Sequence, residues 1–102
     1  MDRQLRYHPL FDRDVREAAQ WYDERSPGLG DAFVERARQC VSDVIADPSR
    51  FALSPGAVRY RRLQRFPYVV LFDVTDSELL MLGVLHIARS IERWRERQEG
   101  DR

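Results

Sequence analysis

The sequence predicts an α+β domain, in which one strand and a two-helix hairpin precede a meander of strands. Apolar residues recur at helical spacing between about residues 11 and 45, and β-branched and aromatic residues become dense between about residues 58 and 87. The chain has 102 residues, which fits one domain with one modest core. We therefore expect a single domain over residues 1–102, with the hairpin packed on a three- to four-stranded antiparallel sheet.

The first strand and the first helix are separated by a proline. Residues 4–8 alternate apolar and polar side chains before Pro9, which is typical of a short strand. The residues that follow recur at helical spacing, namely Phe11, Val15, Ala18 and Tyr22. We expect a helix from Asp12 to Arg25 that stops at the Ser26-Pro27-Gly28 segment.

A second helix follows after a short connection. Its apolar positions run from Leu29 to Val44, and Asp47-Pro48 disfavours continuation of the helix. Because the connection is short and contains Pro27 and two glycines, we expect the two helices to form an antiparallel hairpin.

Three strands are expected in the second half of the chain. They cover residues 58–66, 68–74 and 79–87, and Asp76-Ser77 forms the turn between the last two. The third of these strands is apolar on both sides, which predicts a central position covered on both faces. Ser90 is expected to cap a short C-terminal helix that contains Trp94.

Positive charge is concentrated in one part of a chain whose net charge is zero. All 17 cationic residues are arginine, and residues 48–102 carry ten of them against seven acids. Four fall within seven residues without an acid, namely Arg59, Arg61, Arg62 and Arg65. Alternation places Arg59, Arg61 and Arg65 on one face of the expected strand and Arg62 on the other. This density can attract phosphate or an acidic peptide, although such arginines also form solvated faces paired with nearby acids.

The sequence carries no signal for a cofactor, a metal or a membrane. Cys40 is the single cysteine, and neither a metal-ligand spacing nor a glycine-rich phosphate loop is present. The longest apolar stretch, residues 79–85, is far shorter than a membrane span, and the N-terminus does not resemble a signal peptide. We expect a cytoplasmic protein without cofactors.

Several phrases of the sequence resemble the RelE/ParE toxin family, in its ParE-like plasmid-stabilisation branch. They are Ser-Pro-Gly-Leu-Gly at 26–30, Ala-Asp-Pro-Ser-Arg-Phe at 46–51, the basic segment ending in Phe-Pro-Tyr at 59–68, and Val-Leu-His-Ile-Ala-Arg at 84–89. The phrases occur in the family's order, and the resemblance extends from about Tyr7 to Arg97. It implies the toxin of a type II toxin–antitoxin system, in hetero-oligomeric complex with a cognate antitoxin.

The resemblance leaves two kinds of target open. ParE-like members poison DNA gyrase, which implies no enzyme activity, whereas RelE-like members cleave messenger RNA on the ribosome. For gyrase, the expected target-binding residues are Arg59, Arg61, Arg62, Arg65, Arg89, Arg93 and Trp94. For RNA cleavage, His86 would act as acid or base with Arg61 and Arg89 at the phosphate. A non-toxic binding relative is a third possibility.

The chain departs from the RNA-cleaving pattern at several positions. It has no lysine, Trp94 stands near the C-terminus where the RNA-cleaving branch commonly has a tyrosine, and Ser90-Ile91 replaces the usual Asp-Pro after the arginine. His86 at a strand end could equally be a structural histidine, and Trp94 could anchor the terminal helix. An acidic antitoxin tail is expected opposite Arg59–Arg65, and an apolar groove on the sheet or hairpin would also suit an antitoxin segment.

Overall fold

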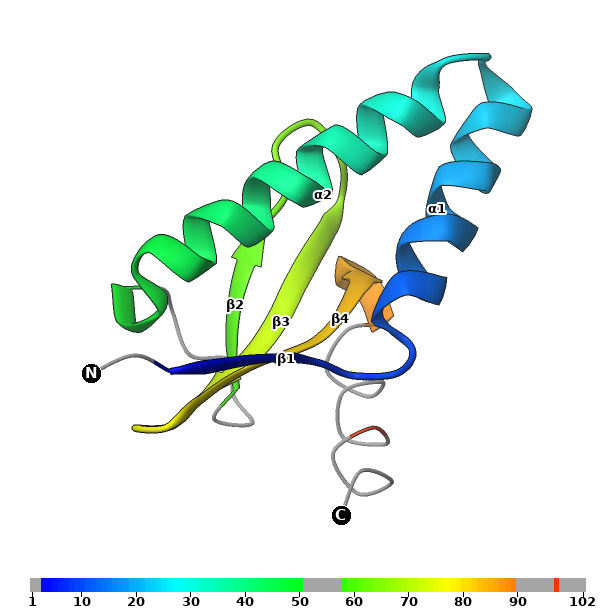
Figure 1. The fold of residues 1–102 in the computed structure, drawn as a ribbon. Helices are drawn as coiled ribbons and strands as arrows, with labels where there is room; N and C mark the ends of the chain where they lie inside the picture. The colour runs from blue at the N-terminus through cyan, green and yellow to red at the C-terminus, as the bar shows by residue number, and fades with distance from the viewer. Residues whose placement is uncertain (1–2, 51–57, 90–96, 98–102) are drawn as a thin grey trace.

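The computed structural model describes residues 3–50, 58–89 and 97, and it places two long helices beside a four-stranded sheet (Figure 1). The helices are α1 (Phe11–Arg25) and α2 (Leu29–Ala46). The strands are β1 (Gln4–Tyr7), β2 (Arg59–Arg62), β3 (Tyr68–Val74) and β4 (Glu78–His86). Two short 3-10 turns, η1 (Pro48–Arg50) and η2 (Ile87–Arg89), follow α2 and β4. The α+β class and the order of these elements are confirmed.

The sheet has the strand order β1-β4-β3-β2 and is mixed. β2, β3 and β4 form the expected antiparallel meander. β1 instead joins β4 in parallel, with Leu5 opposite Leu79 and Tyr7 opposite Met81, so the prediction of a purely antiparallel sheet is wrong for this pair. A parallel neighbour requires a long crossover, and here the connection from β1 to β4 contains the helical hairpin, β2 and β3.

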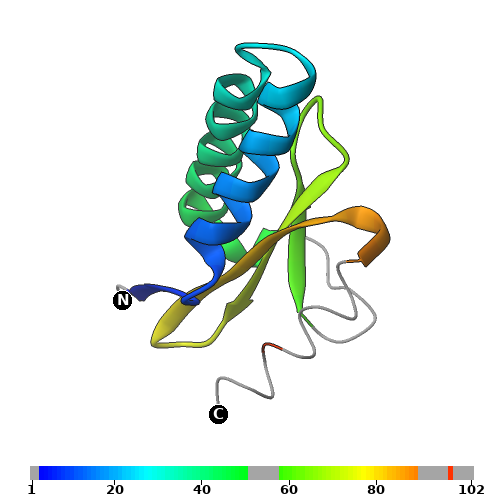
Figure 2. The ribbon, with the colours of Figure 1, turned by 90° about the vertical axis from the view of Figure 1, so that its right-hand side faces the viewer.

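Both helices cover the same face of the sheet (Figure 2). Their apolar sides meet that face in one core, in which Phe33, Val44, Phe72 and Met81 are fully buried. α1 packs chiefly over β4, and α2 over β2 and β3. The burial of these side chains in one layer therefore determines how the two helices lie on the sheet.

The hairpin turn depends on two glycines. Gly28 has φ of 90°, a left-handed conformation that glycine adopts without steric cost. Gly30 lies where α2 approaches α1, because a Cβ there would stand 2.5 Å from the carbonyl oxygen of Ala19. The Gly30 N–H also donates to Asp23 Oδ1 at 2.7 Å. The expected helix hairpin is confirmed, and its geometry requires these small residues.

A smaller apolar cluster lies on the opposite face of the sheet. Its buried members are Val58, Val69, Leu71 and Leu82, with Leu80 and Leu85 packed against them. β4 thus contributes buried residues to both faces, as expected for a central strand.

The strand with the arginines is shorter than the sequence predicts. β2 ends at Arg62, and the segment that leads to β3 contains Arg65 with φ of 78°. Arg65 therefore lies in a turn, and its predicted place on one strand face with Arg59 and Arg61 is wrong. The expected C-terminal helix with Ser90 and Trp94 lies outside the described residues. Among the residues that are described, no helix is long and apolar enough to cross a membrane.

Candidate functional site

Arg61 is held by helix α2. Its Nε and Nη2 atoms donate to Asp43 Oδ2 at 3.2 and 2.9 Å, and both side chains are about a third exposed or less. A hydrogen bond from Gln39 and the Arg61 guanidinium together keep the pKa of Asp43 below its usual value. Asp43 is therefore ionised at neutral pH, and its negative charge compensates the positive charge of Arg61.

Cys40 lies beneath this ion pair. Its Sγ donates to the carbonyl oxygen of Arg61 at 3.5 Å, and burial raises the pKa of the thiol to about 11. The thiol is therefore protonated at neutral pH. Since the thiolate is the reactive form, Cys40 serves here as a small packing residue.

Arg62 and Arg65 are exposed and lie near the turn between β2 and β3. Gln64 in the same turn accepts a hydrogen bond from Arg36 of α2 at 2.9 Å, and Leu63 and Phe66 fix the turn by burying their side chains in the core. The turn is thus anchored to α2, and it presents Arg65 to solvent.

Arg89 and His86 lie at the same end of the sheet. The Ile87 N–H donates to the carbonyl oxygen of Pro67 at 3.0 Å, so η2 lies beside the β2–β3 turn. The ring of His86 meets Tyr68 on the neighbouring strand, with centroids 5.3 Å apart. We call Arg62, Arg65 and Arg89 the arginine end, because the fold brings them to this end of the sheet from two separate segments of the sequence.

Two aromatic side chains, Tyr68 and His86, provide hydrogen-bonding groups at this end. Burial, with Tyr22 nearby, raises the pKa of Tyr68, although Arg89 acts in the opposite direction. The Tyr68 hydroxyl is therefore a proton donor at neutral pH. His86 is exposed and its Nδ1 accepts the Ala88 N–H at 3.1 Å, which leaves the proton of the neutral imidazole on Nε2.

The predicted site residues do not all meet. Arg61 is bound to α2, and β3 separates its strand from the strand of His86. Arg59 lies on β2 opposite Phe72, further from the turn than Arg62. Arg93 and Trp94 lie outside the described residues. Of the three predicted nuclease residues, His86 and Arg89 therefore lie at the same end of the sheet. The third, Arg61, is bound to α2 instead.

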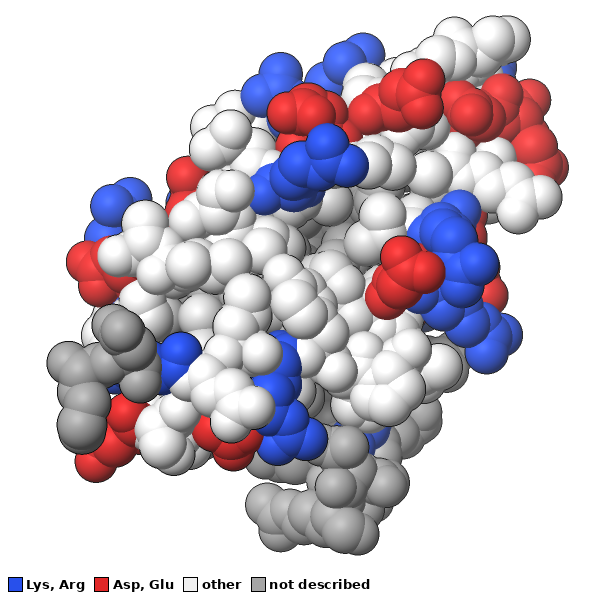
Figure 3. Space-filling view, viewed as in Figure 1, with Lys and Arg blue, Asp and Glu red and all other residues white. Residues whose placement is uncertain are grey.

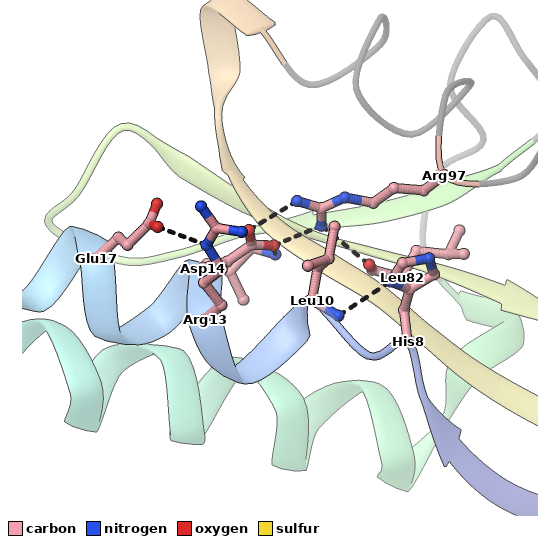
Figure 4. A network of polar contacts seen from close by, with 8 residues as sticks. His8, Leu10, Arg13, Asp14, Glu17, Leu82 and Arg97 are labelled. Carbon is pink, nitrogen blue, oxygen red and sulfur yellow. Dashed lines mark hydrogen bonds and ion pairs between the residues drawn. The ribbon is translucent and has the colours of Figure 1, made fainter. Parts of the chain in front are cut away.

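An ion pair that the sequence analysis missed fastens α1 to the central strand (Figure 4). Arg97 Nη1 and Nη2 donate to the Asp14 carboxylate at 2.5 and 2.7 Å, and both side chains are about nine-tenths buried. Arg97 Nη1 also donates to the Leu82 carbonyl oxygen at 3.2 Å, and the Val84 N–H donates to Asp14 at 3.0 Å. The pairing register of β3 and β4 shifts between Leu71 and Phe72. Opposite this shift, the ion pair provides hydrogen-bond partners for the Leu82 carbonyl and the Val84 N–H. Asp14 and Arg97 are 83 residues apart in the sequence, so no local sequence pattern could predict this contact.

Comparisons with known proteins agree with the fold. A sequence model of the family described as "ParE toxin of type II toxin-antitoxin system, parDE" matches residues 5–91. A solved structure titled "Chromosomal ParDE TA system from P. aeruginosa" is similar in fold, with a TM-score of 0.70 and 20% identity over 82% of this chain and 95% of that chain. No curated protein matches the sequence.

Proposed function

This chain belongs to the ParE toxin family of type II toxin–antitoxin systems, and on that premise we propose that it arrests bacterial growth by binding DNA gyrase. The supporting observation is the arginine end. Within residues 3–50, 58–89 and 97, Arg62, Arg65 and Arg89 form no ion pair, so their charges face outward. Arginine can bind carboxylates or phosphates through two aligned donors, which suits an acidic protein surface or the DNA that gyrase holds.

The proposed action is blockage through contact and requires no cofactor. The target surface comprises the arginine end together with Arg59, Arg61, Arg93 and Trp94, which the sequence analysis assigned to it. Arg61 contributes less than the arginine end, because Asp43 already compensates its charge. Gyrase acts on the chromosome, so we propose that the chain works in the cytoplasm, where its cognate antitoxin neutralises it.

A second candidate function is ribosome-dependent cleavage of messenger RNA. It is favoured by the grouping of His86, Tyr68 and Arg89, in which His86 Nε2 and the Tyr68 hydroxyl could donate protons and Arg89 could bind phosphate. The position of Arg61 on the far side of β3 disfavours it, because the predicted phosphate clamp is then divided.

Induction of the chain alone in a bacterial host separates these functions. We expect growth arrest with a DNA damage response and intact messenger RNA, because a blocked gyrase leaves broken DNA. Growth, the damage response and RNA integrity are measured together. Fragmented RNA that is abolished by His86→Ala would support the nuclease instead, and unaffected growth despite well-folded expression would contradict both functions.

Neutralising the arginine end should abolish the arrest without unfolding the chain. We expect the triple variant Arg62→Gln, Arg65→Gln, Arg89→Gln to allow growth, since the three exposed side chains lose their charge and make no ion pair that supports the described fold. The matched control is Arg13→Gln, Arg16→Gln, which removes two exposed charges from α1, on the helical side of the molecule. Equal toxicity of the triple variant and the control would show that the target is bound elsewhere.

A further inference from the structure

Trp21 is a large aromatic residue that the fold leaves on the surface of α1. It is 48% exposed, although tryptophan side chains are on average highly buried. The Arg25 guanidinium lies over its ring, with Cζ 3.4 Å from the ring centroid, and Arg25 Nη1 donates to the Trp21 carbonyl oxygen at 2.9 Å. The ring of Tyr22 meets the indole edge-on, with centroids 5.0 Å apart. The exposed indole is thus held in place before any partner binds.

Trp21 lies on the flank of α1 that faces β4. Asp14 is two turns earlier on the same flank, and it accepts a backbone N–H of β4 at 3.0 Å. Arg25 follows one turn after Trp21 and extends this flank. The opposite flank contains Asp23, which accepts the Gly30 N–H of α2. Trp21 and Arg25 are therefore on the β4 side of α1 and not on its α2 side.

Tyr22 connects this flank with the arginine end. Its ring contacts Phe66 and Tyr68, with centroids 4.8 and 6.1 Å away. Phe66 follows Arg65, whose Cζ lies 5.6 Å from the Phe66 ring centroid. Tyr68 is paired with His86, the last residue of β4 before η2. The last turns of α1 and the β2–β3 turn accordingly lie towards the same end of the molecule in both ribbon views (Figures 1 and 2).

The charges near Trp21 differ from those on the helical face. Figure 3 shows acidic and basic side chains next to one another over both helices, and Arg13, Arg16 and Arg38 each pair with an acid of their own helix. In the part of the chain that the structure describes, neither Arg25 nor the arginine end forms an ion pair. An apolar ring beside such arginines is complementary to a surface that carries carboxylates around an apolar side chain.

We propose that Trp21 is the apolar anchor with which this chain binds the gyrase protein, and that the arginine end pairs with carboxylates of that protein around it. This inference rests on the proposed function, because it assumes that gyrase is the target. Tryptophan, tyrosine and arginine contribute most to the binding energy of protein interfaces, and a ring that is fixed in advance loses little entropy on binding. Arg25 is a positioning residue, since it holds the indole that the target contacts.

Two features favour a protein partner over a nucleic acid. A stacking base requires an open ring face, and Arg25 already covers one face of the indole. The flank also carries acids, because Glu17 and Glu24 lie about one turn before and after Trp21 and both are exposed. These acids repel a phosphate backbone, whereas grooves that bind single-stranded nucleic acid are positively charged. The rim of a protein interface accommodates charges of both signs.

Binding of the chain to purified gyrase without DNA tests the proposal. We expect Trp21→Ala to weaken binding by at least about thirtyfold, which is typical for the loss of a central anchor. Trp21→Phe keeps a ring beneath Arg25 and should bind within about fivefold of the natural chain. Circular dichroism checks that each variant is folded.

Ile45→Ala is the matched control for the loss of an exposed apolar side chain. Ile45 is 45% exposed and lies at the end of α2 that is remote from the hairpin turn. We expect this variant to bind gyrase like the natural chain. Equal binding by Trp21→Ala and Ile45→Ala would overturn the inference and leave the proposed function in place.

A double-mutant cycle measures the positioning role of Arg25. Arg25→Gln should weaken gyrase binding by about fivefold, because the indole loses the cation that holds it. In the Trp21→Ala background the same substitution should have little effect on gyrase binding, since no indole remains to be held. A role confined to the last turn of α1 would lower the melting temperature in both backgrounds without this coupling. Additive effects on gyrase binding would therefore refute the positioning role.

A photo-crosslinking residue at position 21 identifies what the indole contacts. With benzoylphenylalanine in place of Trp21, we expect a covalent adduct with a gyrase subunit, whereas the same residue in place of Ile45 should give none. An adduct only with DNA, when gyrase holds a DNA fragment, would overturn the inference in favour of a nucleic acid partner. A natural chain that does not bind gyrase at all would refute the proposed function and this inference together.

Discussion

Asp14→Ala should lower the free energy of unfolding by about 3 kcal/mol, because it leaves the Arg97 guanidinium buried without its partner. The substitution also removes the acceptor of the Val84 N–H. For a domain of this size, the melting temperature should fall by more than about 10 °C. Urea unfolding followed by circular dichroism measures the change directly.

Asp12→Ala is the matched control for this effect. Asp12 lies in the same first turn of α1, and it forms an exposed ion pair with Arg16 at 3.0 Å. Such surface pairs contribute at most about 0.5 kcal/mol on a helix. If Asp12→Ala and Asp14→Ala were equally destabilising, the helix dipole would account for both, and the buried pair would have no special role.

Gly83→Ala should be destabilising by about 2 kcal/mol, because the added methyl group would occupy the place of the ion pair. A Cβ on Gly83 would collide with Arg97 Nη1 and stand 2.8 Å from Asp14 Oδ2. Ordinarily the end of an arginine side chain moves aside at little cost. Here that movement breaks the contacts with Asp14 and with the Leu82 carbonyl.

The cost of displacing Arg97 can be measured separately from the cost of placing alanine in β4. In an Arg97→Ala background the guanidinium that the new Cβ would meet is absent and only Asp14 Oδ2 still stands 2.8 Å away, so Gly83→Ala should cost less than in the natural chain. The difference between the two backgrounds is measured by the same unfolding experiment. A cost that is identical in both backgrounds would assign the effect to Asp14 or to the backbone of β4, and not to Arg97.

Periodicity was sufficient to predict the elements of the fold. The helical spacing from Phe11 to Val44 and the apolar run on β4 each describe one element packed against a core, and such patterns depend only on neighbouring residues. The end of β2 could not be predicted in the same way. Residues 63–67 continue the alternation of a strand, but Leu63 and Phe66 are both buried in the main core, and the chain turns to bury them.

The site was only partly predictable for a related reason. The sequence identifies Arg62, Arg65, His86 and Arg89 as candidates, but it shows them as two separate segments. Their meeting depends on the hydrogen bond from Ile87 to Pro67 and on the pairing of Tyr68 with His86. The engagement of Arg61 by Asp43 depends equally on how α2 crosses β2.

The sequence by itself determined the class of fold, the order of its elements and the family, because these follow from local patterns and from phrases of adjacent residues. The tertiary structure alone decided which arginines are paired, that β1 joins β4 in parallel, and that Asp14 and Arg97 meet above Gly83. These features depend on contacts between residues far apart in the chain, and no local pattern encodes such contacts.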